Sequence, residues 1–179
     1  VGWRAWETRM LDLLLINGEI IDGTGNPGFF GAVGVDGDTV SIHRGDIDHI
    51  EAHRVIDITG HVISPGFIDV HSHGGLVILG EPKHEPKVRQ GITTELIGID
   101  GNSVAPFKTQ ADLHRFIELD EGLNGRPPMP ATWSTVADYL SRFDNQVAVN
   151  ICYILGNSPV RIWAVGWNDR PATKGELDD

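Results

Sequence analysis

Two histidines separated by one residue form the part of this 179-residue chain whose side chains are best suited to chemistry. They lie in FIDVHSH, residues 67–73, which has the character of a β-strand. Side chains on a strand alternate between its two faces, so Asp69, His71 and His73 are expected on the same face. Neutral imidazole is a common ligand of zinc and related ions, and this spacing lets both rings reach one ion. The pattern favours a metal site, whereas its alternative is a pair of partly exposed surface histidines.

The elements that must position these histidines change character near Pro65. From Leu11 to about Ile63 the chain is a series of short β-like runs, each closed by Gly, Asn or Asp, which predicts a small antiparallel β unit over residues 10–64. It is the size of a small sandwich or an incomplete sheet. After Pro65 the strand at 67–73, a helical stretch at 85–90 and a strand at 93–99 alternate. Such alternation predicts parallel β/α units and an α/β fold.

Further elements are expected downstream. Apolar residues at helical spacing predict helices over 110–120 and 134–144, followed by a strand at 147–155 and another apolar run at 160–165. Residues 1–9 show no strand or helix period. We interpret them as a non-native or disordered extension before a natural start at Met10, with a genuine N-terminal extension as the alternative.

The spacing of Gly23, Gly25 and Gly28 matches the G-x-G-x-x-G pattern of dinucleotide-binding loops. The following segment, FFGAVGVDG, is a second β-like run rather than a helix, so no helix N-terminus is available for a pyrophosphate. Pro27 also lacks the backbone donor that a phosphate would need. The segment is therefore interpreted as a turn between two strands.

Charge and composition exclude several classes of partner. The 25 acidic and 14 basic residues give a net charge of −11, which would repel a nucleic acid backbone. No apolar run approaches the roughly 18 residues needed to span a bilayer. Cys152 is the single cysteine and cannot form an internal disulfide. We therefore expect no nucleic acid partner, no membrane insertion and a cytoplasmic location.

The motif SPGFIDVHSH resembles the first barrel strand of the amidohydrolase superfamily. Four later segments are similar, in the same order, to the N-acyl-D-amino-acid deacylases of that superfamily: EPKHEPKVRQGITTELIGIDGNS, WSTVADYL, VNICYILGNSPVR and RPAT. The resemblance, which begins at about Leu11, implies a partial (β/α)₈ TIM-type barrel preceded by a small β-sandwich-like domain. Residues 65–179 number 115, against roughly 250 for a complete barrel, so they would form about three of its eight units.

The resemblance also implies which side chains bind the metal. His71 and His73 match the metal-binding pair, and Asp100 in G-I-D-G stands where many relatives have a cysteine in G-N-C-G. Zinc is the expected divalent ion. A carboxylate is a harder ligand than a thiolate, so it would loosen the preference for zinc and make manganese, iron or cobalt more plausible. The alternative for Asp100 is a turn residue before Gly101.

Other positions carry weaker expectations. Arg161 matches an arginine of the relatives and is expected to bind a substrate carboxylate, with a structural ion pair as its alternative. Asp69 is expected to orient a neighbouring group rather than to bind metal. Relatives often have a polar or acidic residue where Gly74 and Gly75 follow His73, and a histidine at Asn157. Two further histidines, His84 and His114, are interpreted as solvated.

The activity implied by the resemblance is metal-dependent hydrolysis of carbon–nitrogen bonds in small N-acyl amino acids, most closely N-acyl-D-amino acids. The family's catalytic aspartate and two further metal-binding histidines lie on later strands, so this chain alone is predicted to be an inactive fragment. The alternatives are an imidase or dihydroorotase-like amidohydrolase, or a non-catalytic metal-binding fragment. The acyl group, the amino-acid side chain and the stereochemistry of the substrate are left open.

Overall fold

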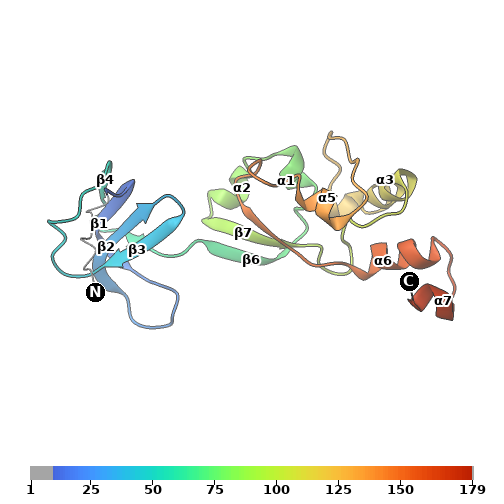
Figure 1. Cartoon of the computed structure of the whole chain (residues 1–179), viewed down its shortest axis with the longest axis horizontal. Coiled ribbons are helices and arrows are strands. Elements are labelled where there is room, and N and C mark those ends of the chain that lie inside the picture. The colour runs from blue at the N-terminus through green and yellow to red at the C-terminus, as the bar shows by residue number, and fades with distance from the viewer. Residues whose placement is uncertain (1–9, 179) are drawn as a thin grey trace, which may run out of the picture. The chain divides into compact units, whose positions relative to one another are not determined.

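The chain divides into two compact units, with the boundary between Pro65 and Gly66. The computed structural model describes residues 10–178 and is shown in Figure 1. The interpretation of residues 1–9 as an extension lies outside this described part. None of the described helices combines the length and apolar character that crossing a membrane requires.

The first unit is built on one mixed sheet with the strand order β3-β2-β1-β4, in which β5 also pairs with β1. Its strands are β1 (Leu13–Ile20), β2 (Phe29–Asp36), β3 (Thr39–His43), β4 (Val55–Asp57) and β5 (Val62–Ile63). The β1–β2 and β2–β3 pairs are antiparallel, as predicted. The antiparallel prediction is wrong for β4 and β5, which run parallel to β1 because the segment between β3 and β4 carries the chain back to the start of β1. A second layer, which a sandwich requires, is not seen among residues 10–65.

The glycine-rich segment between β1 and β2 is a turn, as the sequence predicted. Gly23 and Gly25 have φ values of 78° and 85°, in the left-handed region that glycine adopts without steric cost. The strands that they join are antiparallel neighbours, so no helix follows the turn.

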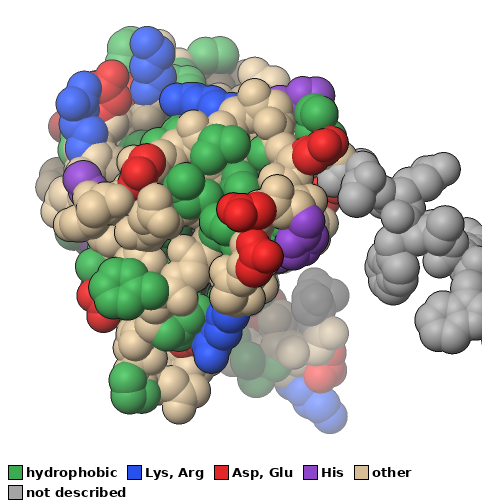
Figure 2. All heavy atoms as spheres, turned by 90° about the vertical axis from the view of Figure 1, so that its left-hand side faces the viewer, with side chains coloured by type: hydrophobic (Ala, Val, Ile, Leu, Met, Phe, Trp, Pro, Cys, Tyr) green, Lys and Arg blue, Asp and Glu red, His purple; other side chains and the backbone are tan. Residues whose placement is uncertain are grey.

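Apolar side chains are exposed on the surface of the molecule, where they lie among charged ones (Figure 2).

The second unit contains three parallel strands in the order β6-β7-β8. The strands are β6 (Phe67–Ser72), β7 (Ile92–Ile97) and β8 (Asn150–Tyr153). Between β6 and β7 lie α1 (Val77–Gly80) and α2 (Glu85–Val88), and between β7 and β8 lie α3 (Gln110–Leu119), α4 (Glu121–Asn124) and α5 (Val136–Leu140). The chain continues into α6 (Asn157–Val165) and α7 (Lys174–Asp178). The predicted alternation of parallel strands and helices is confirmed.

Local sequence explains where the longer helices begin. The Thr109 side chain accepts a hydrogen bond from the backbone of Asp112 at the start of α3. Thr135 and Asp138 form a reciprocal capping box at the start of α5. The helix α5 is shorter than the predicted range 134–144, because the chain leaves helical geometry after Leu140 and turns through Asn145, which has a φ of 56°.

The core of the second unit is rich in aromatic side chains. Tyr139 is fully buried, and its ring centroid lies 4.9 Å from that of Trp133 and 5.1 Å from that of Phe143. The indole nitrogen of Trp133 donates a hydrogen bond of 2.7 Å to the carbonyl of Val104, in the loop that follows β7. This packing attaches the loop beyond β7 to the helical layer, which fixes the end of the strand that precedes Asp100.

Candidate metal centre

The candidate ligands lie at the carboxyl ends of two neighbouring strands. In the parallel β6–β7 pair, Asp69 is opposite Glu95 and Ser72 is opposite Ile97, so the two strands end at the same edge of the sheet. His73 follows β6 directly, and Asp100 lies three residues after the end of β7. Strand pairing therefore brings the two segments together.

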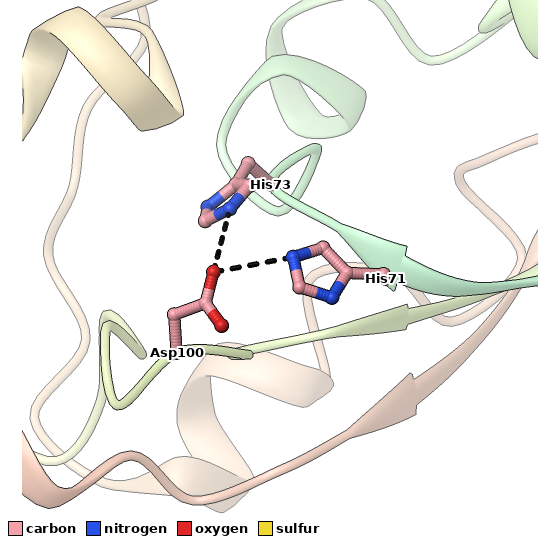
Figure 3. A group of neighbouring side chains, drawn as sticks. All are labelled: His71, His73 and Asp100. Atoms are coloured by element: carbon pink, nitrogen blue, oxygen red, sulfur yellow. Dashed lines mark ion pairs between the residues drawn. The ribbon is translucent and has the colours of Figure 1, made fainter.

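The three side chains converge, as Figure 3 shows. The Nε2 atoms of His71 and His73 lie 3.2 Å and 3.3 Å from the same carboxylate oxygen of Asp100. One ligand atom from each residue lies within 4.8 Å of the other two. The side chains of His71 and Asp100 are 62% and 53% exposed, against 21% for His73, so one side of the group is open to solvent.

The backbone around Asp100 is unusual. Asp100 itself has a φ of 55° and Gly101 a φ of 79°, and aspartate is one of the few residues other than glycine that is enriched in this region. Gly98, with a φ of 82°, approaches the residue after β8 so closely that a Cβ atom would lie 2.2 Å from the carbonyl oxygen of Ile154. Asp100 is therefore a turn residue, and the turn also directs its carboxylate toward the histidines.

His73 has a second partner on the side of its ring away from Asp100. Its Nδ1 atom lies 3.0 Å from the side-chain oxygen of Asn124, which is buried at the end of α4. The amide nitrogen of Asn124 donates a hydrogen bond to Asp120. Burial raises the pKa of the Asp120 carboxyl. Sequence reasoning missed this contact, because 51 residues separate His73 from Asn124.

Asp69 contacts the backbone that carries His71. Its carboxylate accepts a hydrogen bond of 3.0 Å from the backbone nitrogen of His71 and another from the ammonium group of Lys87. These bonds, with that from Lys87 the larger, lower the pKa of Asp69 below its usual value. The contacts agree with the expected orienting role, and Asp69 is not in the group of three that could share an ion.

A buried polar group lies beside Ser72, the residue between the two histidines. Glu95 on β7 is fully buried and accepts a hydrogen bond from the hydroxyl of Ser72, while its other oxygen lies 2.6 Å from Nε2 of His84. The interpretation of His84 as solvated is wrong, because its ring is buried against this carboxylate. His114 is exposed, as interpreted, and its Nε2 lies 2.9 Å from the carbonyl of Ala131. The sequence does carry one sign of this buried contact, because Glu95 is an acidic residue inside the apolar run TTELIGI.

The two glycines after His73 have a steric explanation. A Cβ atom at Gly74 would lie 3.0 Å from the carboxylate of Glu95, and one at Gly75 would lie 2.5 Å from the hydroxyl of Tyr139. Contacts this short require neighbouring atoms to shift. The residues buried behind β6 therefore leave little room for the larger side chains expected in relatives.

Arg161 does not join the three candidate ligands. It lies on α6, and its guanidinium donates hydrogen bonds of 2.9 Å and 2.7 Å to the backbone carbonyls of Asn168 and Arg170. Its side chain also lines a pocket of about 390 Å³ that includes Asn102. Substrate binding by Arg161 stays a prediction, and its observed contacts hold the loop after α6.

Comparison with known proteins relates most of the chain to one group of hydrolases. The chain is 34% identical over 172 residues to the D-aminoacylase of Alcaligenes xylosoxydans xylosoxydans, an alignment that covers 96% of this chain and 34% of that protein. It is likewise 34% identical over 166 residues to the N-acyl-D-aspartate deacylase of the same organism, covering 92% of this chain and 32% of the relative. No family model matches the chain.

The fold agrees with these sequence relationships. A solved structure of N-acyl-D-glutamate deacylase from Bordetella bronchiseptica, complexed with zinc and a phosphonate inhibitor, superimposes with a TM-score of 0.77 at 30% identity. The match covers 95% of this chain and 34% of that structure. The chain thus spans about a third of the length of the proteins that it matches. It is a relative of the N-acyl-D-amino-acid deacylases of the amidohydrolase group.

Proposed function

We propose that the complete protein hydrolyses the amide bond of N-acyl-D-amino acids with the help of a divalent metal ion, and that His71, His73 and Asp100 contribute to its metal site. The observation that carries this proposal is the convergence of two imidazole nitrogens on one carboxylate oxygen at the ends of two parallel strands. The relationship to deacylases supports the class of substrate.

The donor set fits a divalent metal ion. Two imidazole nitrogens and one carboxylate oxygen, all within 4.8 Å of one another, match the ligand types of zinc sites and leave coordination positions for water or substrate. Zinc is the first candidate, and the carboxylate in place of a thiolate makes manganese, iron or cobalt acceptable. When bound, such an ion lowers the pKa of a coordinated water and polarises a carbonyl group.

The residues of this chain would hold and orient the reacting groups. His71 and His73 supply neutral nitrogen donors, and Asp100 supplies a negative charge that offsets part of the charge of a cation. Asp69 fixes the backbone of His71 through its hydrogen bond with the His71 amide. The exposed side of the group gives a small acylated substrate access to this edge of the sheet.

We further propose that residues 65–179 form the first units of a (β/α)₈ barrel and that residues 10–64 belong to a small β domain. Three neighbouring parallel strands with helices in each connection support the first part. Active sites of such barrels lie at the carboxyl ends of the strands, where the three side chains converge. The catalytic aspartate expected from the family would come from a later strand.

Zinc binding tests the site on this chain. Titration of the 179-residue chain with zinc, followed by calorimetry, is expected to show one site that His71→Ala, His73→Ala or Asp100→Ala each weakens. His49→Ala is the matched control, because His49 is an exposed histidine of the first unit. Zinc binding that all three site variants retain at the wild-type affinity would refute the proposed ligands.

Hydrolysis tests the activity. The complete protein, loaded with zinc, is expected to release free amino acid from N-acetyl-D-amino acids and to lose most of this activity in the His73→Ala variant. The L-enantiomers and cyclic imides serve as comparison substrates. The 179-residue chain is expected to show no turnover, since hydrolysis also needs a positioned proton carrier. Turnover of imides alone would contradict the deacylase assignment while leaving the metal site intact.

A further inference from the structure

We propose that Asn124 and Asp120 are positioning residues that fix the ring proton of His73 on Nδ1 and so present the lone pair of its Nε2 to the cation site. This inference rests on the proposed metal site and adds to it two residues outside the three ligands. It follows from which hydrogen bonds three connected side chains can donate and accept. Asp120 contacts Asn124, and Asn124 contacts His73.

The first step is the orientation of the Asn124 amide. An ionised carboxylate can only accept hydrogen bonds, whereas an asparagine side chain has one donor end and one acceptor end. Asp120 lies against the amide of Asn124, so the NH₂ group must face Asp120. The carbonyl oxygen of Asn124 is then the atom that faces His73. The contact with Asp120 thus settles which way round the amide lies, a choice that is otherwise inferred from the network.

The second step is the tautomer of His73. The Asn124 oxygen lies 3.0 Å from Nδ1 of His73, and this oxygen can only accept. Nδ1 must therefore carry a proton. A neutral imidazole has one ring proton, so its Nε2 then has a free lone pair, which is the form that binds metal.

The third step concerns what lies between Nε2 and Asp100. Nε2 lies 3.3 Å from a carboxylate oxygen, and two electron-rich atoms at this distance repel unless a proton or a metal cation lies between them. A divalent ion bound to both atoms removes the repulsion. The Asn124 contact therefore supports the metal-binding form of His73 and disfavours the neutral form with its proton on Nε2.

Burial makes this contact effective. Asn124 is 6% exposed, so its hydrogen bonds face little competition from water. The two histidines differ in this respect. The His71 ring lies 3.2 Å from Asp100 through its Nε2 and contacts the His73 ring, and its side chain is 62% exposed. His73 is consequently the pre-oriented member of the pair, and His71 gains a fixed orientation only when an ion binds.

The tautomer can be measured directly. Two-bond ¹⁵N–¹H correlation spectra of the metal-free 179-residue chain, recorded near pH 8, are expected to show the Nδ1–H form for His73, assigned with His73→Ala. Asn124→Ala is expected to shift His73 toward the Nε2–H form. His114 is an internal reference, because its Nε2 lies 2.9 Å from a backbone carbonyl and must keep its own proton there. If the alanine variant loses the His114 signal on unfolding, the near-isosteric Asn124→Leu variant, which also lacks an acceptor for Nδ1 of His73, gives the same comparison.

Metal affinity provides the second measurement. Loss of an outer hydrogen-bond partner typically lowers metal affinity roughly 10- to 100-fold, so Asn124→Ala should weaken zinc binding by about that factor while His114 keeps its tautomer. A wild-type His73 with its proton on Nε2, or unchanged zinc affinity in a folded Asn124→Ala variant, would overturn the inference. If the wild type binds no zinc, the proposed function fails, whereas the tautomer of His73 still decides the role of Asn124.

Discussion

Asp100 has two tasks that impose different demands on one residue. Its backbone must adopt a φ of 55°, and its carboxylate must lie 3.2–3.3 Å from two imidazole nitrogens. Aspartate and asparagine tolerate this backbone better than most residues, because their short side chains can be accommodated there. The carboxylate therefore suits both the turn and the proposed ion.

Replacing this carboxylate by a thiolate should change the preference for metals. In Asp100→Cys the softer sulfur ligand is expected to raise the ratio of zinc to manganese affinity on the order of tenfold, the size of effect that changes in a ligand environment produce. Asp100→Asn is the control and should weaken binding of both ions. Competition titrations with the two ions measure this ratio independently of overall stability. An unchanged ratio in the cysteine variant would argue against direct coordination.

Glu95 is the residue on which the packing behind the site depends most. Glu95→Ala leaves Ser72 and His84 without their buried partner, and removal of one member of a buried pair typically costs about 3–5 kcal/mol. Urea unfolding monitored by tryptophan fluorescence measures the change in the free energy of unfolding. The control is Glu85→Ala, which removes an exposed pair with Arg89 and should cost less than about 1 kcal/mol. Equal losses in the two variants would contradict the importance of the buried network.

Single residues also show how far sequence reasoning reaches. Alternation on a strand placed His71 and His73 together, and the pairing of parallel strand ends placed Asp100 beside them. Asn124 could not be found in this way, because no periodicity connects residues that meet only through tertiary packing. His84 was misjudged for a related reason. Its side chain is buried against Glu95 on β7, and the residues next to His84 in the sequence give no sign of this contact.

At the scale of elements, a hydrogen-bonded aspartate connects α3 with the loop that follows α6. Asp112 accepts hydrogen bonds of 2.6 Å from Thr109 and 2.8 Å from the indole of Trp167. The guanidinium of Arg115 lies 4.1 Å from the centre of the Trp167 ring. These contacts lower the pKa of Asp112, with the bond from Thr109 the largest cause.

This connection should make stability depend on pH. Because the pKa of Asp112 is lower in the folded state than its unfolded value of about 3.9, its stabilisation is present above that value and is lost as the pH falls through the folded value. Asp112→Asn should therefore lose about 1.5–3 kcal/mol at neutral pH and much less near pH 2. Urea midpoints across this range test the effect, with the exposed Asp144→Asn as control. A deficit that stays constant with pH would exclude the carboxylate charge as its cause.

The elements themselves were predictable to different degrees. The helix α3 was predicted within one residue, since its apolar positions and its threonine cap agree with each other. The helix α5 ended early, because apolar spacing continues to Phe143 after helical backbone geometry has stopped. The parallel pairing of β4 and β5 with β1 was missed, because short strands carry no signal of direction.

On the scale of the whole molecule, apolar side chains remain exposed on an edge strand. β6 is at one edge of its sheet, and Phe67, Ile68 and Val70 are 61–66% exposed. Ile154 and Leu155, which follow β8 at the other edge, are 45% and 51% exposed. Unpaired strand edges with apolar side chains favour association with other chains.

The 179-residue chain should therefore self-associate. Light scattering coupled to gel filtration is expected to show a mean mass that rises with protein concentration, and the double variant Ile68→Lys, Val70→Lys should remain monomeric over the same range. The double variant Val40→Lys, Ile42→Lys is the matched control, because it places the same charge on two exposed apolar positions of the first unit. A monomeric wild type, or equal suppression by the control, would contradict a role for β6.

The closeness of the candidate ligands in sequence bears on the order in which the protein folds. His71 and Asp100 are 29 positions apart (100 − 71), and both belong to a single β-strand, helix, β-strand unit. Contacts between residues that are close in sequence form sooner than contacts between residues that are far apart in sequence. A cation that bridges these residues would stabilise the β6–β7 pair on its own. We therefore expect metal to bind early on the ribosome, soon after Asp100 has emerged, and to bias the nascent chain toward the correct strand pairing.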